Sequence, residues 1–402
     1  MRRRKKSASS FMKILMGVTV FLPSSIYGGP ATVAMNQARE LSRRGHEVTI
    51  ISSNVLQLRP YACIEQRDTI LDGVVVRYFP THLVLAKVSA LVSLALKRWL
   101  KQSIRDYDVI HVHFARDWIP LTIANEALRQ RAKVIIQPHG MLGRTGGLRG
   151  VLDSFWTRRI LTQAAGVLAL QATELRNIKN IAPAAKALVL SNGVRVPKDS
   201  VQWDPETLRR RRVLFLARLH PRKRVMDVLE AIRVLHSRGY SVSLRVVGPD
   251  EGDLPKARAF ASAHGIANII EFVGAVSPSQ VQSEYLNASV YVLPSIDEPF
   301  PMTILEAMAI GVPTIVTESI HIRGMLERHG ASRVVKQGPD EIASAVMEVL
   351  TDTRLAISLS ENGKHLINTR LSIGQIVNSL EAIYTGTSSR SEPSATDGVV
   401  ES

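Results

Sequence analysis

Cysteine is almost absent from this sequence. Its 402 residues include one, Cys63, which excludes an internal disulfide and any metal site built from several thiolates. A chain without structural disulfides suits a reducing compartment, so we predict a cytoplasmic protein. A peripheral position on the inner face of the plasma membrane is the alternative that the charge of the chain leaves open.

Long apolar runs are missing too. A helix needs about 20 mainly apolar residues to cross a bilayer, and no stretch reaches that length without charges. The nearest candidate is residues 83–101, whose apolar positions recur at helical spacing: Leu85, Val88, Val92, Leu96 and Trp99. Basic residues occupy the opposite side, which is typical of a helix lying in a membrane surface. A crossover helix packing its apolar side on a sheet is the alternative, and we favour it.

Acidic and aromatic residues are few relative to basic ones. The formal net charge is +16, and aromatic residues make up 5% of the chain. A positive field attracts the phosphates of nucleic acid or of lipid. Because the sequence has no nucleic-acid-binding motif and few rings for base stacking, we expect no nucleic-acid partner and favour an anionic membrane surface. A surface that is basic only for solubility remains the alternative.

The N-terminal region combines basic residues 2–6 with an apolar run over residues 11–22, a pattern shared with secretory signal peptides. Lys13 interrupts this run, however, and a helical pattern over residues 31–44 and a strand pattern over residues 47–52 follow it. The order predicts an uncleaved first strand over residues 14–21. Residues 1–11 are then a disordered basic extension, with Met12 as an alternative start.

Strand and helix patterns alternate in two series. The first series of strands covers residues 14–21, 47–52, 74–79, 109–114, 134–137, 167–170 and 187–190. The second covers residues 213–217, 242–247, 269–273, 290–293, 314–317 and 333–335. Such alternation indicates parallel sheets with helices on both faces. We therefore predict an α/β fold with two doubly wound, Rossmann-like domains that face a central cleft.

The domain boundary is expected in a Pro-containing, polar stretch over residues 193–207. We predict a first domain over residues 12–196 and a second over residues 197–385, with the last helix able to cross back to the first. Residues 386–402 are rich in Ser, Glu, Pro and Thr and predict a disordered tail.

Polar residues and glycines follow several predicted strands. They are Gly28 and Gly29 after the first strand, His139 after residues 134–137, Arg218 and Lys223 after residues 213–217, and Glu298 after residues 290–293. Loops and helix N-termini at the carboxyl ends of parallel strands form ligand-binding edges. Facing domains would bring these edges together across one cleft.

A pair of carboxylates, Glu298 and Glu306, brackets the junction between the strand at residues 290–293 and a following helix. Glu306 ends the sequence Thr303-Ile304-Leu305-Glu306, which also fits a capping box. Ligand binding and helix capping are thus both open for Glu306. For Glu298, a loop carboxylate held only by solvent is the alternative to a ligand contact.

These segments together resemble the retaining glycosyltransferases of family 4. The E-x7-E segment from Glu298 to Glu306, with Arg218 and Lys223, carries the resemblance, which extends over about residues 12–385. It implies the GT-B fold and an enzyme that moves a sugar from a nucleotide-diphosphate sugar to a hydroxyl acceptor, with retention and without a metal. The nucleotide sugar is then a co-substrate, no cofactor is implied, and the acceptor is a cell-surface polysaccharide or a lipid-linked glycan.

The resemblance also implies roles for single residues. Arg218 and Lys223 would stabilise the diphosphate, Glu306 would accept hydrogen bonds from the ribose, and Glu298 would contact sugar hydroxyls near the anomeric carbon. His139 would contact the donor sugar or its phosphate. The donor-binding set implied by the resemblance is completed by Gly28, Gly29, Phe300, Met302 and Thr303. The first domain would hold the acceptor and the second the nucleotide sugar.

Three positions depart from the family pattern, one of them being Ala217, which replaces a usual Gly or Ser and looks tolerable. Pro301 stands where the family usually has Gly, which removes one backbone donor, and Arg224 replaces a usual Gly after Lys223. A nucleotide-sugar epimerase of the same fold group is one alternative function. A non-catalytic basic protein that binds lipid or nucleic acid is the other.

Overall fold

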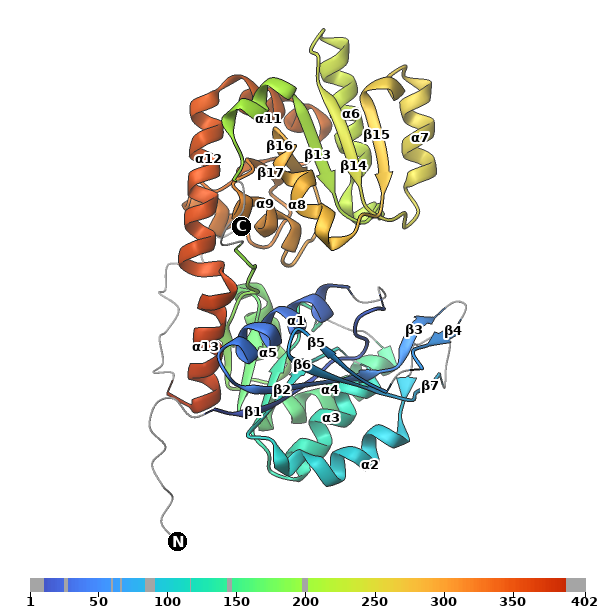
Figure 1. Cartoon of the computed structure of the whole chain (residues 1–402), viewed down its shortest axis with the longest axis vertical. Helices are drawn as coiled ribbons and strands as arrows, with labels where there is room; N and C mark the ends of the chain where they lie inside the picture. Colours follow the sequence, from blue (N-terminus) through green and yellow to red (C-terminus); the bar gives the residue numbers. More distant parts are fainter. Residues whose placement is uncertain are drawn as a thin grey trace. The chain divides into compact units, whose positions relative to one another are not determined.

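The computed structural model describes residues 11–24, 28–58, 61–65, 67–83, 91–115, 117–142, 147–196 and 202–387. These residues form two compact units. Unit 1 runs to Gly193 and resumes at Ile373, and unit 2 comprises Val194–Ser372. The division expected between residues 196 and 197 thus falls slightly earlier, and the last helix belongs to unit 1 (Figure 1). The predicted extension and tail lie almost entirely outside the described residues.

In its described part, unit 1 is built on an eight-stranded sheet. The strands are β1 (Lys13–Gly17), β2 (Glu47–Ser53), β5 (Asp68–Leu71), β6 (Val74–Phe79), β9 (Val109–His113), β10 (Val134–Gln137), β11 (Gly166–Ala169) and β12 (Ala187–Val189). Their spatial order is β12-β11-β10-β9-β1-β2-β6-β5. Neighbours are parallel except β5, an antiparallel edge strand on β6 that was not predicted. β1 lies between β9 and β2, so the apolar N-terminal run forms an interior strand.

Helices cover both faces of this sheet. On one face, α1 (Gly28–Arg43) and α13 (Ile373–Thr385) pack into a common core. On the other lie α2 (Leu94–Ser103), α3 (Trp118–Arg129), α4 (Gly147–Gln163) and α5 (Ala172–Ile181) (Figure 1). α1 shows why the sequence folds this way, because Ala31, Ala34, Ala38 and Leu41 recur on one helical stripe and all are buried.

The helix predicted over residues 83–101 is shorter in the structure. β7 (His82–Leu83) pairs antiparallel with β8 (Leu91–Val92), and the positions between them, including Leu85 and Val88, lie outside the described residues. α2 begins only after Ser93, whose hydroxyl accepts a hydrogen bond from the Leu96 amide at 3.1 Å. The start at residue 83 was therefore wrong. The crossover-helix alternative is confirmed, because Leu96 and Leu100 are fully buried against the sheet.

Unit 2 holds a second sheet, whose six described strands are all parallel. They are β13 (Arg212–Leu216), β14 (Ser243–Val247), β15 (Ile270–Gly274), β16 (Val290–Leu293), β17 (Thr314–Thr317) and β18 (Arg333–Val335), in the order β15-β14-β13-β16-β17-β18. The α-helices between or after these strands are α6 (Val225–Ser237), α7 (Leu254–Ala263), α8 (Pro278–Leu286), α9 (Met302–Ile310), α10 (Arg323–Arg328), α11 (Pro339–Thr351) and α12 (Thr353–Leu366), most of them labelled in Figure 1. The prediction of two doubly wound, Rossmann-like domains is confirmed.

A small antiparallel pair adds to unit 1 and was not predicted. β3 (Val55–Leu58) pairs with β4 (Tyr61–Cys63) beyond the end of β2. Cys63 ends this pair and is exposed.

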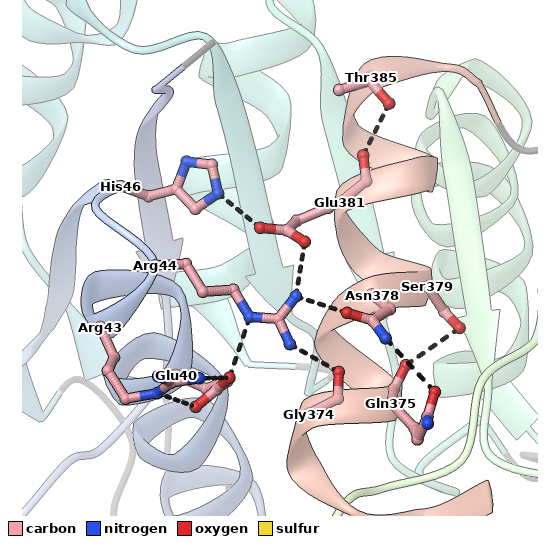
Figure 2. Close-up of polar contacts among 10 residues, drawn as sticks. All are labelled: Glu40, Arg43, Arg44, His46, Gly374, Gln375, Asn378, Ser379, Glu381 and Thr385. Carbon is pink, nitrogen blue, oxygen red and sulfur yellow. Dashed lines mark hydrogen bonds and ion pairs between the residues drawn. The ribbon is translucent and has the colours of Figure 1, made fainter. Parts of the chain in front are cut away.

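Polar contacts attach the last helix to unit 1. Arg44, directly after α1, donates to Glu40 at 2.9 Å, to Asn378 and Glu381 at 2.7 Å each, and to the Gly374 carbonyl at 2.8 Å (Figure 2). The second carboxylate oxygen of Glu381 lies 2.8 Å from His46 Nε2. One guanidinium therefore links α1 to two turns of α13, although these segments are far apart in the sequence.

We expect Arg44→Ala to loosen α13. Hydrogen bonds to charged groups contribute about 1.5–3 kcal/mol each when the loss leaves partners unpaired, so the free energy of unfolding should fall by roughly 2 kcal/mol or more. Amide hydrogen exchange in α13 should rise accordingly. Arg43→Ala is the matched control, because Arg43 is more exposed and its described partner is Glu40 on its own helix. Equal exchange of α13 in both variants would contradict the assignment.

Candidate active site

The loops that carry the predicted donor residues leave one edge of the unit 2 sheet. β13 lies between β14 and β16, and all three run parallel. Their carboxyl ends therefore share one edge. Arg218 and Lys223 follow β13, and Glu298 follows β16.

Lys223 and Glu298 form an ion pair at this edge. The Lys223 ammonium donates to Glu298 Oε2 at 2.6 Å, and each side chain is 16% exposed. The loops that carry them are joined as well, because the Ile296 amide donates to the Arg222 carbonyl at 2.9 Å and the Arg222 guanidinium donates to the Asp297 carbonyl. The structure thus brings together two of the predicted residues that lie far apart in the sequence.

Arg224 adopts a left-handed backbone conformation. The family resemblance leads us to expect glycine at this position. Its φ is +57° and its ψ +41°, a region that favours residues without a Cβ. The guanidinium makes a two-point contact with Asp227 at 2.8 and 2.9 Å. This substitution keeps the turn that places Lys223, and the Asp227 contact offsets part of the backbone cost.

Arg218 is directed to a different loop. Its Nη1 donates to both oxygens of Glu251, at 2.8 and 2.9 Å, in the loop after β14. Gly248 starts that loop with φ +142°, and an added Cβ there would lie 1.9 Å from the Ala217 carbonyl oxygen. The close approach of the two loops therefore requires glycine at position 248. Glu251 was not among the predicted site residues, although its place after the strand predicted at residues 242–247 was the available signal.

Glu306 lies on α9, and the capping-box interpretation of it was wrong. α9 begins at Met302, and its N-cap is Pro301, which makes no side-chain cap. Thr303 is therefore inside the helix rather than at its cap. The Glu306 carboxylate lies 3.3 Å from the Tyr285 hydroxyl, and burial raises its pKa to about 7 although part of the residue stays accessible.

Two buried tyrosines support the start of α9. The Tyr285 hydroxyl donates to the Thr303 carbonyl at 2.9 Å, and the Tyr291 hydroxyl lies 2.8 Å from Thr303 Oγ1. The rings meet edge to face with centroids 5.7 Å apart. Phe300 is buried before the helix, whereas Met302 and Thr303 keep partial exposure. Neither tyrosine carried a sequence signal, because aromatic residues in a strand and a helix read as ordinary core.

In unit 1, His139 occupies a strained turn after β10. Its φ is +56°, and two neighbours hold the turn. Glu174 on α5 accepts from the Gly140 amide at 2.5 Å and from the Leu170 amide at 2.7 Å, while His113 Nδ1 lies 2.8 Å from His139 Nε2. Backbone strain of this kind persists only where surrounding contacts fix it.

Burial favours the neutral form of the three histidines of this region. Burial lowers the pKa of His139 to about 3 and that of His111 to about 3, and burial also lowers the pKa of His113 well below its usual value. His111 contacts the Tyr384 hydroxyl at 2.6 Å. Among the described residues, His139 Nδ1 and His113 Nε2 have no hydrogen-bond partner. His139 therefore keeps one buried ring nitrogen that no described residue of the chain uses.

The glycine pair stands at the first turn of α1. Gly28 begins the helix, and an added Cβ at Gly29 would meet nothing within 4 Å. Packing within unit 1 therefore does not require glycine at position 29. A small cavity of about 20 Å³ lies nearby, lined by Val18, Thr19, Val20, Pro30, His113, Ala115 and Met141.

In the described part of the chain, no group of three or more His, Cys, Asp or Glu side chains is arranged to hold a metal ion. The same residues contain no helix with the length and apolarity that crossing a bilayer requires.

Curated proteins and solved structures match this chain over most of its length. It is 26% identical over 404 residues to an uncharacterized glycosyltransferase of Methanocaldococcus jannaschii, which covers 93% of this chain and 98% of that protein. It is 24% identical over 364 residues to a putative teichuronic acid biosynthesis glycosyltransferase of Bacillus subtilis, with 83% and 88% covered. The structure of Anabaena HepE in complex with UDP superposes with a TM-score of 0.73 at 15% identity, covering 93% of this chain and 100% of that one.

Two family models match consecutive parts of the chain. Residues 27–197 match the model described as Glycosyltransferase Family 4, and residues 202–366 match the model described as Glycosyl transferases group 1. The chain therefore belongs to the family 4 glycosyltransferases and has the GT-B fold.

Proposed function

We propose that this transferase moves a sugar from a nucleotide-diphosphate sugar to a hydroxyl acceptor in the synthesis of a cell-surface polysaccharide or a lipid-linked glycan. The observation that carries the proposal is the Lys223–Glu298 pair, at 2.6 Å, on the carboxyl edge of a parallel sheet. The HepE complex with UDP and the teichuronic acid relative support a nucleotide donor and a polysaccharide product.

Negative charge that develops on the leaving diphosphate gives the two cations, Lys223 and Arg218, their role in this proposal. During transfer, the bond between the anomeric carbon and the phosphate oxygen breaks, and the diphosphate leaves with the bonding electron pair. Lys223 and Arg218 lie on one sheet edge and offer N–H donors to this group, which suits stabilisation of an oxyanion without a metal. The Arg218–Glu251 pair is more than half exposed on the arginine side, so a bound phosphate can replace the carboxylate at little cost.

The E-x7-E segment suits the neutral part of the donor. Carboxylates are strong acceptors for hydroxyl donors, so we assign Glu306 to the ribose and Glu298 to the sugar hydroxyls near the anomeric carbon. The first amides of α9, with Phe300, Met302 and Thr303, offer a helix N-terminus to the phosphates. Pro301 removes one of these donors.

Retention follows in our proposal from attack on the same face. The acceptor oxygen forms the new bond to the anomeric carbon as the phosphate oxygen leaves, and the acceptor proton passes to an oxygen of the departing phosphate. In unit 1, we assign the neutral His139 imidazole to the donor sugar or its phosphate and the Gly28-Gly29 turn to close approach of a phosphate. We place the enzyme in the cytoplasm, with the donor as co-substrate and no further cofactor.

Removing either member of the ion pair should abolish activity. We expect Lys223→Ala and Glu298→Ala each to lower transfer by at least about 100-fold, because each removes a charge placed for the reacting group. Arg209→Ala is the control, since Arg209 is exposed in the turn at Pro205–Arg210 and pairs with Glu206. Release of nucleotide from UDP, GDP and ADP sugars measures the rate, and circular dichroism checks the fold.

Full activity in both variants would refute this site. Product analysis with a nucleotide sugar alone distinguishes the transferase from an epimerase, the main rival function, because an epimerase changes the sugar without an acceptor. If none of the nucleotide sugars stabilises the protein against heat, a non-catalytic binding function fits better.

The raised pKa of Glu306 predicts that donor binding depends on pH. Burial keeps the carboxyl partly protonated near pH 7, and ribose hydroxyls donate best to the ionised form. Affinity for a nucleotide sugar should therefore rise roughly tenfold between about pH 6 and about pH 8. The sugar ester has no phosphate that titrates in this range, so the change reports on the protein.

Glu306→Gln provides the control for this dependence. It keeps the shape and loses the titration, so its affinity should stay flat across the same range. The same shift makes the free energy of unfolding of the wild type fall as the pH rises from about 4.5 to about 7, because the unfolded chain ionises first. If the affinity for a nucleotide sugar changes with pH in the same way in the wild type and in Glu306→Gln, the role given to Glu306 is wrong.

A further inference from the structure

The helix layer formed by α2, α3 and α4 in unit 1 exposes basic and aromatic side chains on its outward side. α2, α3 and α4 pack side by side on the same face of the sheet (Figure 1). Their inner sides form the core, with Leu96, Ile123 and Ile160 fully buried. The apolar side of α2 is thus unavailable to a membrane, and any external partner must meet the outward side of the layer.

The outward side carries a set of cations. They are Lys97, Arg98, Lys101 and Arg105 on and directly after α2, with Arg158 and Arg159 on α4, and all are exposed. None of the six forms an ion pair with a carboxylate in the described part of the chain. Among the acids of this layer whose side chains the structure describes, Glu126 on α3 is buried, and Asp106 and Asp108, which follow α2, are exposed without pairing with any of the six cations.

Basic residues elsewhere in the chain are commonly paired. Arg77, Arg233 and Arg245, for example, contact Asp68, Glu230 and Glu284 at 2.5 to 3.0 Å. An exposed surface with several unpaired cations maintains a positive potential that paired surfaces lack. The charge of the layer is therefore available to a partner rather than used within the fold.

Exposed aromatic side chains lie on α3 and α4 of the same layer. Phe155 and Trp156 on α4 are 76% and 44% exposed, and Trp118 at the start of α3 is 45% exposed. The two indoles contact each other edge to face with centroids 5.7 Å apart. Leu94, at the start of α2, is exposed as well. Large apolar side chains gathered at one surface mark an interaction site rather than random exposure.

We infer that this face, the outward side of α2, α3 and α4 defined above, docks on an anionic lipid bilayer. Tryptophan and phenylalanine rings insert at the headgroup level of a bilayer, while lysine and arginine beside them bind acidic headgroups. Nucleic acid would need open ring faces for base stacking, whereas the two indoles contact each other edge to face and Leu94 and Phe155 add apolar bulk that suits lipid. The inference does not rest on the donor site, whose ion pair lies in unit 2.

Vesicle binding of the full chain tests the inference. Vesicles with about one third phosphatidylglycerol in phosphatidylcholine should bind the protein at low salt, and pure phosphatidylcholine vesicles should bind it much less. Lys97→Glu/Lys101→Glu should weaken binding roughly thirtyfold or more. Phe155→Ala should weaken binding while leaving its salt dependence unchanged, since it removes insertion and no charge. Tryptophan emission should shift to shorter wavelength as the exposed indoles enter the headgroup region.

Lys256→Glu/Arg354→Glu is the matched control. Both residues are exposed on unit 2, and the change in net charge is the same as in the α2 variant. If this control loses as much vesicle binding as Lys97→Glu/Lys101→Glu, net charge alone explains the attraction and the docking face is wrong. Absence of binding to the anionic vesicles, or binding to single-stranded RNA that exceeds vesicle binding and needs the same residues, would also overturn it.

Discussion

Parallel strand pairing is the constraint on which this structure depends. In a parallel sheet every carboxyl end points to the same edge, so loops that are far apart in the sequence emerge together. In unit 2 this brings the loop after β13 against the loop after β16, and the Lys223–Glu298 pair closes the contact. Gly248 permits the loop after β14 to approach the same place, because no side chain fits beside the Ala217 carbonyl.

Burial gives the polar groups at these edges their chemical character. Removal from water favours the neutral form of an ionisable group, which raises the pKa of Glu306 and lowers that of His139. Both residues are held by neighbours that do not themselves look functional in the sequence. Tyr285 reaches Glu306, and Glu174 fixes the turn after His139. Supporting contacts of this kind pre-organise a site at the cost of local stability.

The strands were the most predictable part of the fold. β10, β16 and β17 have the bounds expected from their apolar runs, because a strand buried on both faces needs continuous Val, Ile and Leu. The antiparallel strand β5 escaped prediction, since its exposed positions interrupt such a run. Helix starts were less certain. Ser93 and Pro301 set the beginnings of α2 and α9, and both overrode the periodicity or capping pattern around them.

The sequence by itself determined the alternation of strands and helices, the family, and the identity of the residues that follow each strand, because these are local patterns of burial and short motifs. The tertiary structure decided which of those residues meet. It paired Lys223 with Glu298, directed Arg218 to Glu251, joined His113 to His139, and gathered Trp118 and Trp156 on one basic face. Contacts between distant segments arise only when strand order and helix packing are set, and no local pattern encodes them.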